Sequence, residues 1–374
     1  MWGEVLTEPH IPPGSQESRN ESFIQRKFLG GWPKAFTAST RENISAPITT
    51  EEAGEVLRRM RVAAAPGPDG LTVNVYQHQW DLLGPLWLAM IEEAEEKGAL
   101  PEGVTVGRVP LLPKSDSKIR KAEENRPIST LNSDYKLLTT LMASRLNGGM
   151  GEVVGELQTG FIAGRFIGDN VIFNRDMLAQ MRIDENQQAV IFLDFQKAYD
   201  RVKWEWLWKV LEHVGLEGRF LNLTKACYAS PSITLMLEGV SMGQLSPTRG
   251  VRQGCPLSPL LFALSIEPLH YRLRTHRQLV GLRLPRTTDN KRLPNVRASL
   301  FADDVTLFPA DEVDARRMLG IVKEFGYASG SALNMKKSLV VFALPSQQKS
   351  FAGLTVVQPG DTVKSLGILY GPAV

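Results

Sequence analysis

The sequence has few of the features that mark specialised classes of protein. Two cysteines in 374 residues are too few for a disulfide framework or a cysteine zinc site, which fits a reducing compartment inside the cell. No apolar run reaches the ~20 residues that a membrane span needs, and the N-terminus lacks the basic and then apolar pattern of a signal peptide. The net charge is only +3, so charge alone does not identify a nucleic-acid-binding protein. With 43% hydrophobic residues, the chain is expected to be globular, soluble and intracellular.

The most informative stretch is 297–308, where Asp303 and Asp304 interrupt an otherwise apolar, strand-like sequence. Residues 298–302 and 305–308 each have the composition of a short strand, whereas aspartate is a poor strand residue. The stretch therefore predicts a tight hairpin with both carboxylates at its tip. A solvated turn is one interpretation, because aspartate is common in turns. A divalent-metal site is the other, since adjacent carboxylates withdrawn from water need a positive charge to neutralise them.

A second acid stands where another predicted strand ends. Residues 189–194 form an apolar run that finishes at Asp194, and a helix is expected from Trp204 to Val214. Catalytic acids are presented at strand ends in many folds. An N-cap for the turn that follows is the alternative role for Asp194.

A glycine-containing loop at 249–254 precedes a helix that is expected to begin at Pro256 and to run towards Arg274. Its glycines let the backbone approach a ligand, and Arg252 and Gln253 offer hydrogen-bond donors. The donors, the glycines and the helix N-terminus together indicate a site for an anionic or polar planar ligand.

The loop from Lys114 to Arg126 carries several cations and could bind phosphates, although an ordinary solvated loop is the alternative because runs of charge are often merely exposed. Arg165 lies in a glycine-containing turn at 158–165, where the glycines permit tight backbone geometry. Lys336 and Lys337 lie where a loop meets the predicted strand at 339–344, and ordinary surface lysines are the alternative there.

The remaining pattern predicts a mixture of helices and strands. Residues 1–50 have few periodic apolar positions and are expected to be a tail or the remnant of an upstream linker. Helices are predicted at 50–60 after a Thr49 cap, at 76–97, 135–146, 169–181 and 314–325, strands at 104–112 and 339–344, and a hairpin at 233–245.

Taken in order, these motifs resemble the reverse transcriptases of non-LTR (LINE-type) retrotransposons. The resemblance covers roughly residues 45–370, and it outweighs the alternatives stated for each motif alone. The segments that carry it are FLDFQKAYDRV at 192–202, RQGCPLSPLLF at 252–262 and FADD at 301–304, with APGPDG at 65–70, RPIS at 126–129, QTGFIAGR at 158–165, LNMKKS at 333–338 and LGI at 366–368.

The resemblance implies an α+β right-hand polymerase with fingers and palm subdomains, an antiparallel palm sheet backed by helices, and a missing thumb. The implied division is 1–50 as a tail, 51–188 as the first part of the fingers, 189–214 as the first palm segment, 215–248 as the second part of the fingers, and 249–374 as the rest of the palm.

The resemblance also implies RNA-directed DNA polymerase activity, with Asp194, Asp303 and Asp304 holding two Mg²⁺ ions for which Mn²⁺ can substitute. The expected partners are an RNA template, a DNA primer and deoxynucleoside triphosphates, and the expected location is the nucleus. A domesticated or decayed relative that binds nucleic acid without polymerising is the alternative function.

Further roles follow from the same resemblance, residue by residue. Tyr199 is expected to lie under the incoming sugar and to exclude a 2′-hydroxyl, while Gln253 and Gly254 line the nucleotide. Lys337, with Lys336 beside it, is expected near the leaving pyrophosphate. Arg126 is expected at the triphosphate. The expected nucleic-acid contacts are Lys114, Arg165 and Arg252.

Overall fold

The computed structural model describes residues 2–9, 11–113, 125–183, 188–237, 239–286 and 288–372. Its contacts divide the chain into two compact units, each assembled from three separate segments. Unit 1 comprises Met1–His10, Lys34–Val153 and Tyr199–Phe262, and unit 2 comprises Ile11–Pro33, Val154–Ala198 and Ala263–Val374. None of the described helices is long and apolar enough to cross a membrane.

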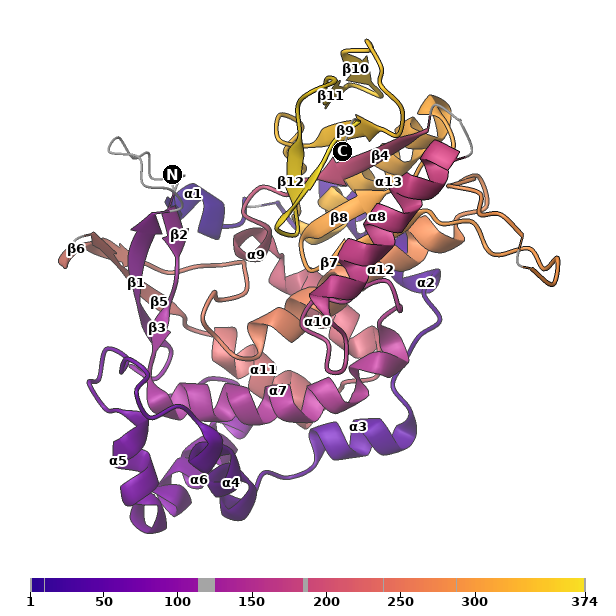
Figure 1. The fold of residues 1–374 in the computed structure, drawn as a ribbon. Helices are drawn as coiled ribbons and strands as arrows, with labels where there is room; N and C mark the ends of the chain where they lie inside the picture. The colour runs from indigo at the N-terminus through magenta and orange to yellow at the C-terminus, as the bar shows by residue number, and fades with distance from the viewer. Residues whose placement is uncertain are drawn as a thin grey trace. The chain divides into compact units, whose positions relative to one another are not determined.

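Unit 1 combines helices with one mixed sheet (Figure 1). The sheet has the order β2-β1-β5-β6, with β3 also paired to β1, and only the β1–β5 pair is parallel. Its strands are β1 (Val106–Pro113), β2 (Asn125–Pro127), β3 (Thr130–Leu131), β5 (Ser232–Leu237) and β6 (Val240–Leu245). Its helices are α1 (Trp2–Leu6), α3 (Ala38–Ser45), α4 (Thr50–Arg59), α5 (Val73–His78), α6 (Trp80–Lys97), α7 (Ser133–Val153), α10 (Trp204–His213) and α11 (Arg219–Tyr228).

The cap predicted at Thr49 is confirmed. The Thr49 hydroxyl accepts a hydrogen bond from the Glu52 N–H at 3.2 Å, and α4 begins at the next residue. Leu57 on α4 is buried, and α4 packs against α6 and α7. The 21-residue α7 buries an apolar face that includes Leu138 and Leu141, so it forms part of the core of unit 1.

Unit 2 is built on a six-stranded sheet with the order β10-β11-β9-β4-β8-β7. All five residues of the central strand β4 are buried, as expected for a strand covered on both faces. The strands are β4 (Ala189–Leu193), β7 (Ala298–Phe301), β8 (Asp304–Leu307), β9 (Leu339–Phe342), β10 (Ser350–Phe351) and β11 (Leu354–Val356); β12 (Val363–Ser365) and β13 (Ile368–Tyr370) form a separate hairpin. Two helices in this unit are α2 (Gln16–Gly30) and α13 (Glu312–Ser329).

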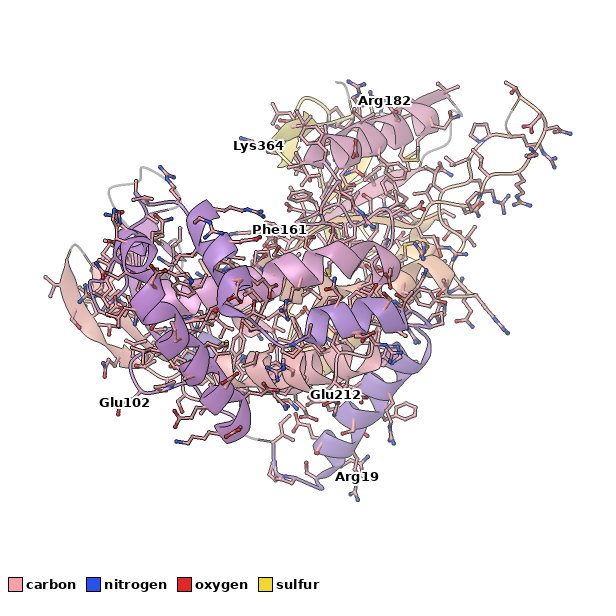
Figure 2. The ribbon with its side chains drawn as sticks, turned by 90° about the horizontal axis from the view of Figure 1, so that it is seen from below. Arg19, Glu102, Phe161, Arg182, Glu212 and Lys364 are labelled. Carbon is pink, nitrogen blue, oxygen red and sulfur yellow. The ribbon has the colours of Figure 1, made fainter. Side chains whose placement is uncertain are left out.

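Helix α8 (Ile167–Ile183) lies along this sheet (Figure 1). Leu178 and Met181 on α8 share a buried cluster with Phe192 of β4. Arg182, labelled in Figure 2, donates hydrogen bonds from α8 to the carbonyls of Ala343 and Gly371. Helix α8 is therefore fixed to the sheet by apolar packing and at its C-terminal end by an arginine.

The expectation of an antiparallel sheet is correct for four of the five described strand pairs in the six-stranded sheet of unit 2. The exception is the parallel pair between β9 and β11. Residues 343–353, which include β10, connect the two strands and provide the length that a parallel return requires. The fold is therefore mixed α/β, with antiparallel and parallel pairing in both large sheets.

The first 50 residues, expected to be a tail or the remnant of an upstream linker, contain three helices, α1, α2 and α3. The Ser15 hydroxyl caps α2, and Phe28 on α2 packs edge-on against Phe325 of α13 with ring centroids 5.5 Å apart. In unit 1, Leu6 packs with Val109 and Ile233. The apolar positions in this region are too widely spaced in the sequence to give a periodic signal.

Two further helices connect the segments. Helix α9 (Ala198–Arg201) follows the loop after β4, and α12 (Ser258–Thr275) follows the glycine-containing loop.

Candidate functional site

The predicted hairpin is confirmed, and it is tighter than its sequence indicates. Strands β7 and β8 pair as far as Phe301 and Asp304, which leaves a loop of only Ala302 and Asp303. Ala302 is buried and has a φ of 54°, in the left-handed region. A positive φ at the first loop residue is typical of a type II′ hairpin turn, which usually has glycine there. Asp303 therefore lies at the tip, and Asp304 is the first residue of β8.

Asp194 directly follows the central strand β4, which pairs with β8 through Leu193 opposite Val305. If this register continues by one residue, Asp194 stands opposite Asp304. Helix α9 begins four residues later at Ala198, so Asp194 is not its N-cap. The fold thus brings Asp194 to the same end of two adjacent strands as Asp303 and Asp304, which lie more than 100 positions later in the sequence.

The charges of these acids influence one another. The pKa of Asp304 is raised to about 6, first because surrounding protein withdraws its carboxyl group from water, and then because Asp303 and Asp194 carry charges of the same sign. The residue as a whole is exposed, so this desolvation is partial. A cation placed among the three carboxylates would relieve the repulsion and lower that pKa.

The described part of the chain contains no group of three or more Asp, Glu, His or Cys side chains gathered closely enough to hold a metal ion. The chemistry of the three acids nevertheless fits Mg²⁺, which prefers carboxylate oxygens and keeps several water ligands. Asp194 and Asp303 are each partly exposed, so solvent reaches both residues. The geometry that suits a cation is the position of Asp194 at the end of β4, beside the β7–β8 hairpin that carries Asp303 and Asp304.

A segment that follows α13 holds Asp194 in place. The Asn334 side-chain amide donates to Asp194 Oδ2 at 2.9 Å, and the Asn334 main-chain N–H donates to the Asp194 carbonyl at 2.8 Å. The buried Ser338 hydroxyl accepts the Asp194 N–H at 3.1 Å. The same segment carries Lys336 and Lys337, whose side chains are exposed. Asn334 and Ser338 were missed in the sequence because they carry no charge, although both lie within a segment that supports the resemblance.

A second group of predicted site residues lies in unit 1, in and around the glycine-containing loop: Tyr199, Arg252, Gln253 and Gly254. Gly254 has a φ of 102°, and a Cβ atom there would lie 2.4 Å from the Ser129 carbonyl oxygen, so only glycine fits. The Ser129 N–H donates to the Gln253 carbonyl at 2.8 Å, and Gln253 Nε2 donates to the buried Asp200 at 3.3 Å. Both the backbone and the side chain of Gln253 are therefore restrained.

Tyr199 belongs to the same group. Its ring stacks on Phe262 with centroids 4.6 Å apart and planes inclined by 12°. The Val251 N–H donates to its carbonyl at 2.8 Å. The structure therefore brings Tyr199, Gln253 and Gly254 together within unit 1, and it brings the three acids together within unit 2.

Two of the predicted nucleic-acid contacts are turned towards protein atoms. Arg252 is only 8% exposed, donates to the Thr105 carbonyl at 2.6 Å and lies over the Tyr135 ring. Arg165 donates to backbone carbonyls close to it in the sequence, those of Val154, Gly155 and Gln158. Lys114 lies outside the described residues, and the side chain of Arg126 is not described.

The buried residue Gln158 was not selected from the sequence. Its Oε1 atom accepts two main-chain N–H groups, one of which belongs to Ala302 in the hairpin loop. Phe161, labelled in Figure 2, lies in the same turn, with its ring 6.1 Å from that of Phe301 on β7. The QTGF sequence at 158–161 was the available signal, but its glycine suggested only a tight turn.

Comparison with known proteins supports one family. Residues 112–368 match the family profile described as "Reverse transcriptase (RNA-dependent DNA polymerase)". The chain is 36% identical over 300 residues to the "Transposon TX1 uncharacterized 149 kDa protein" of Xenopus laevis, an alignment that covers 80% of this chain and 22% of that protein. It is 25% identical over 340 residues to the "Retrovirus-related Pol polyprotein from type-2 retrotransposable element R2DM" of Drosophila melanogaster, an alignment that covers 91% of this chain and 29% of that protein. It is 26% identical over 298 residues to the type-1 retrotransposable element R2 polyprotein of Popillia japonica, an alignment that covers 79% of this chain and 39% of that protein. The chain thus spans less than two fifths of the length of each of these relatives.

Proposed function

This chain belongs to the reverse transcriptase (RNA-dependent DNA polymerase) family, and we propose that it catalyses RNA-directed DNA synthesis on a primer 3′-hydroxyl. The observation that carries the proposal is the meeting of three acids at the end of β4 and at the β7–β8 hairpin, with the pKa of Asp304 raised to about 6. We also propose that unit 2 is the palm and that unit 1 contains the fingers.

The three acids are the residues that would hold the metal. Two Mg²⁺ ions bound there would supply activation of the primer hydroxyl and neutralisation of the triphosphate charge. The contribution of the protein is to fix the position and charge of the ligands. Asn334 occupies one oxygen of Asp194 at 2.9 Å, which orients the other oxygen, and the two-residue loop limits the positions that Asp303 can take.

The nucleotide would be held by residues of unit 1. We propose that Tyr199, supported from one side by Phe262, lies against the sugar and excludes a 2′-hydroxyl. The restraint of Gln253 by Asp200 and Ser129 supports a role for this loop in positioning the nucleotide. The exposed Lys336 and Lys337 are proposed contacts for the leaving pyrophosphate, and Arg126 and Lys114 remain proposed contacts for the triphosphate and template.

The contacts of Arg165 and Arg252 support a different role from the one expected. Arg165 donates to three protein carbonyls and the buried Arg252 to one, so we propose that both arginines support the loops around the site instead of contacting nucleic acid. The proposed partners remain an RNA template, a DNA primer and deoxynucleoside triphosphates. A nuclear location is proposed because the relatives are named as transposon or retrotransposable-element proteins.

Primer extension on an RNA template with Mg²⁺ tests the proposal. Asp303→Asn or Asp194→Asn is expected to lower the rate by roughly 10³-fold, because losing one ligand charge costs several kcal/mol of transition-state stabilisation. Asp176→Asn, on the exposed face of α8, is the matched control and is expected to extend normally. Extension by Asp303→Asn at the parent rate would refute the assignment. Binding of primer-template without extension by the parent chain would favour the nucleic-acid-binding alternative.

A further inference from the structure

The loop that carries Asp303 is attached to a distant turn in unit 2. The turn at 157–160 runs beside β7, with the Leu300 N–H donating to the Leu157 carbonyl at 2.8 Å and the Thr159 N–H donating to the Leu300 carbonyl at 3.1 Å. The Leu300 carbonyl also accepts a hydrogen bond from the Asn170 side chain at 2.6 Å. These bonds fix the final part of β7 before the chain turns at Ala302.

Gln158 makes the contact to the loop itself. Its side chain is completely buried, and its Oε1 atom accepts the N–H of Gly160 and the N–H of Ala302, each at 3.0 Å. Its Nε2 atom has no hydrogen-bond partner within the described part of the chain. The oxygen is therefore the end of the side chain through which Gln158 acts on the loop.

Gly160 provides the space for this contact. A Cβ atom on Gly160 would lie 2.4 Å from the Ala302 nitrogen and 3.1 Å from the Phe301 carbonyl carbon. These are backbone atoms, so they cannot move away without shifting the hairpin. The loop that they belong to already holds Ala302 in a left-handed conformation that alanine disfavours. Such a conformation persists only where its surroundings enforce it.

The turn at 157–160 is itself held by two side chains, those of Arg165 and Glu267. The Arg165 guanidinium donates to the carbonyls of Val154, Gly155 and Gln158. The buried Glu267 on α12 accepts the Gly155 N–H at 3.0 Å. Gln158 is therefore fixed at its backbone by an arginine and at its side chain by the hairpin loop.

We propose that Gln158 and Gly160 are positioning residues that enforce the Ala302 turn and so set the location of the Asp303 carboxylate relative to Asp304 and Asp194. The inference rests on the proposed polymerase function, because it assigns these acids a catalytic task. A displacement of about 1 Å in a catalytic group can lower a rate by about 10²-fold. A buried acceptor and a glycine behind the loop are the means by which this chain limits such displacement.

The test compares variants of the full chain. Gln158→Met removes the acceptor and keeps the bulk of the side chain, whereas Gln158→Glu keeps an oxygen acceptor at the same place. Gly160→Ala adds a Cβ atom that would clash with the Ala302 nitrogen. Gly320→Ala is the matched glycine control, since it lies within α13 and a Cβ atom there meets nothing within 4 Å.

Three measurements follow: hydrogen exchange of peptides spanning 298–307, Mn²⁺ affinity by electron paramagnetic resonance, and kcat and KM for primer extension. Gln158→Met and Gly160→Ala are expected to speed exchange in the hairpin, to weaken Mn²⁺ binding, and to lower kcat by about 10- to 100-fold with little change in KM for primer-template. Gln158→Glu is expected to recover most of kcat, and Gly320→Ala to behave as the parent.

The outcomes separate this inference from the proposed function. Normal kcat and Mn²⁺ affinity in folded Gln158→Met and Gly160→Ala, with Asp303→Asn inactive, would overturn the inference alone. An active Asp303→Asn variant would overturn the proposed function. Hydrogen exchange and Mn²⁺ affinity would still show whether Gln158 and Gly160 hold the hairpin loop in place. If neither Gln158→Met nor Gly160→Ala folds, hydrogen exchange of the parent protein tests the proposal. The Ala302 amide is expected to exchange slowly, and exchange at the rate of an open loop would overturn the proposal.

Discussion

Asn334 is joined to Asp194 by two hydrogen bonds, one from its side-chain amide to Asp194 Oδ2 at 2.9 Å and one from its main-chain N–H to the Asp194 carbonyl at 2.8 Å. The two residues are 140 positions apart in the chain. The loop after β4 and the segment before β9 are therefore linked at this point. An amide donor suits this place, because it orients a carboxylate without adding a charge that would compete with a metal ion.

Replacing Asn334 by alanine should therefore lower kcat for primer extension by about 10- to 100-fold, since hydrogen bonds to charged groups contribute about 1.5–3 kcal/mol. Asn334→Asp should be worse than Asn334→Ala, because it puts a second negative charge against Asp194. Thermal melting measured beside the kinetics separates unfolding from a local effect. Equal rates for the parent and both variants would show that Asn334 does not orient Asp194.

The raised pKa of Asp304 predicts how the metal-free protein responds to pH. Because the folded-state pKa, about 6, lies above that of the unfolded chain, ionisation of Asp304 disfavours folding above about pH 6. Below about pH 4 the group is protonated in both states and the penalty vanishes. Without divalent ions, Asp304→Asn should therefore melt at a higher temperature than the parent at neutral pH and at the same temperature near pH 4. A variant that melts lower at neutral pH would contradict the repulsion among the three acids.

With Mg²⁺ added at neutral pH, the parent should melt at a higher temperature than Asp304→Asn, the reverse of the order expected without divalent ions. A ligand that binds only the folded state raises the melting temperature with its concentration. The parent should gain stability on adding Mg²⁺ at neutral pH and lose it on adding EDTA, and Asp303→Asn and Asp304→Asn should respond less. Protons compete for the same carboxylates, so the Mg²⁺ effect should shrink as the pH falls through about 6. An equal Mg²⁺ response in all three proteins would place the ion elsewhere.

The stacking of Tyr199 on Phe262 predicts a specific effect on sugar selection. Tyr199→Ala removes the ring and should raise ribonucleotide incorporation relative to deoxyribonucleotide incorporation by about tenfold. Tyr199→Phe keeps the ring and the stacking, and it should keep the discrimination. The ratio of kcat/KM values for the two nucleotides measures the effect, and an unchanged ratio in an active Tyr199→Ala variant would remove Tyr199 from this role.

The parts of the fold that the sequence predicted are those with a strong local cause. Thr49 starts α4 as a cap, and the apolar runs on both sides of the acids form β7 and β8. The helices of residues 1–50 were missed, because few of their positions are buried. In α2, only Gln25, Phe28 and Leu29 are buried, and they pack on a helix some 300 residues away in the sequence.

The site shows the same division between local and distant causes. Asp303 and Asp304 were selected because adjacent carboxylates in an apolar run are unusual, and Asp194 because it ends a predicted buried strand. Gln158, Asn334 and Ser338 were not, because an uncharged side chain acquires its role only from the backbone groups that the fold brings to it. Arg165 illustrates the opposite case, since the family resemblance implied a nucleic-acid contact whereas its donors are directed at carbonyls of neighbouring residues.

Salt dependence of binding can decide between these two roles for Arg165. A side chain that contacts phosphate releases counterions, so removing it lowers the slope of log K against log salt by about 1. A side chain that supports a turn leaves that slope unchanged but destabilises the fold. We expect Arg165→Ala to cost about 2–4 kcal/mol of unfolding free energy, because it removes the hydrogen bonds that Arg165 donates to the Val154, Gly155 and Gln158 carbonyls.

Lys337→Ala is the matched cation control, because Lys337 is exposed and a proposed phosphate contact. It should leave the melting temperature almost unchanged and flatten the salt slope for primer-template binding. Arg165→Ala should lower the melting temperature and leave the salt slope for primer-template binding unchanged. If Arg165→Ala flattens the slope of log K against log salt and leaves stability unchanged, Arg165 contacts nucleic acid. The turn that holds Gln158 would then depend on Glu267 for its support.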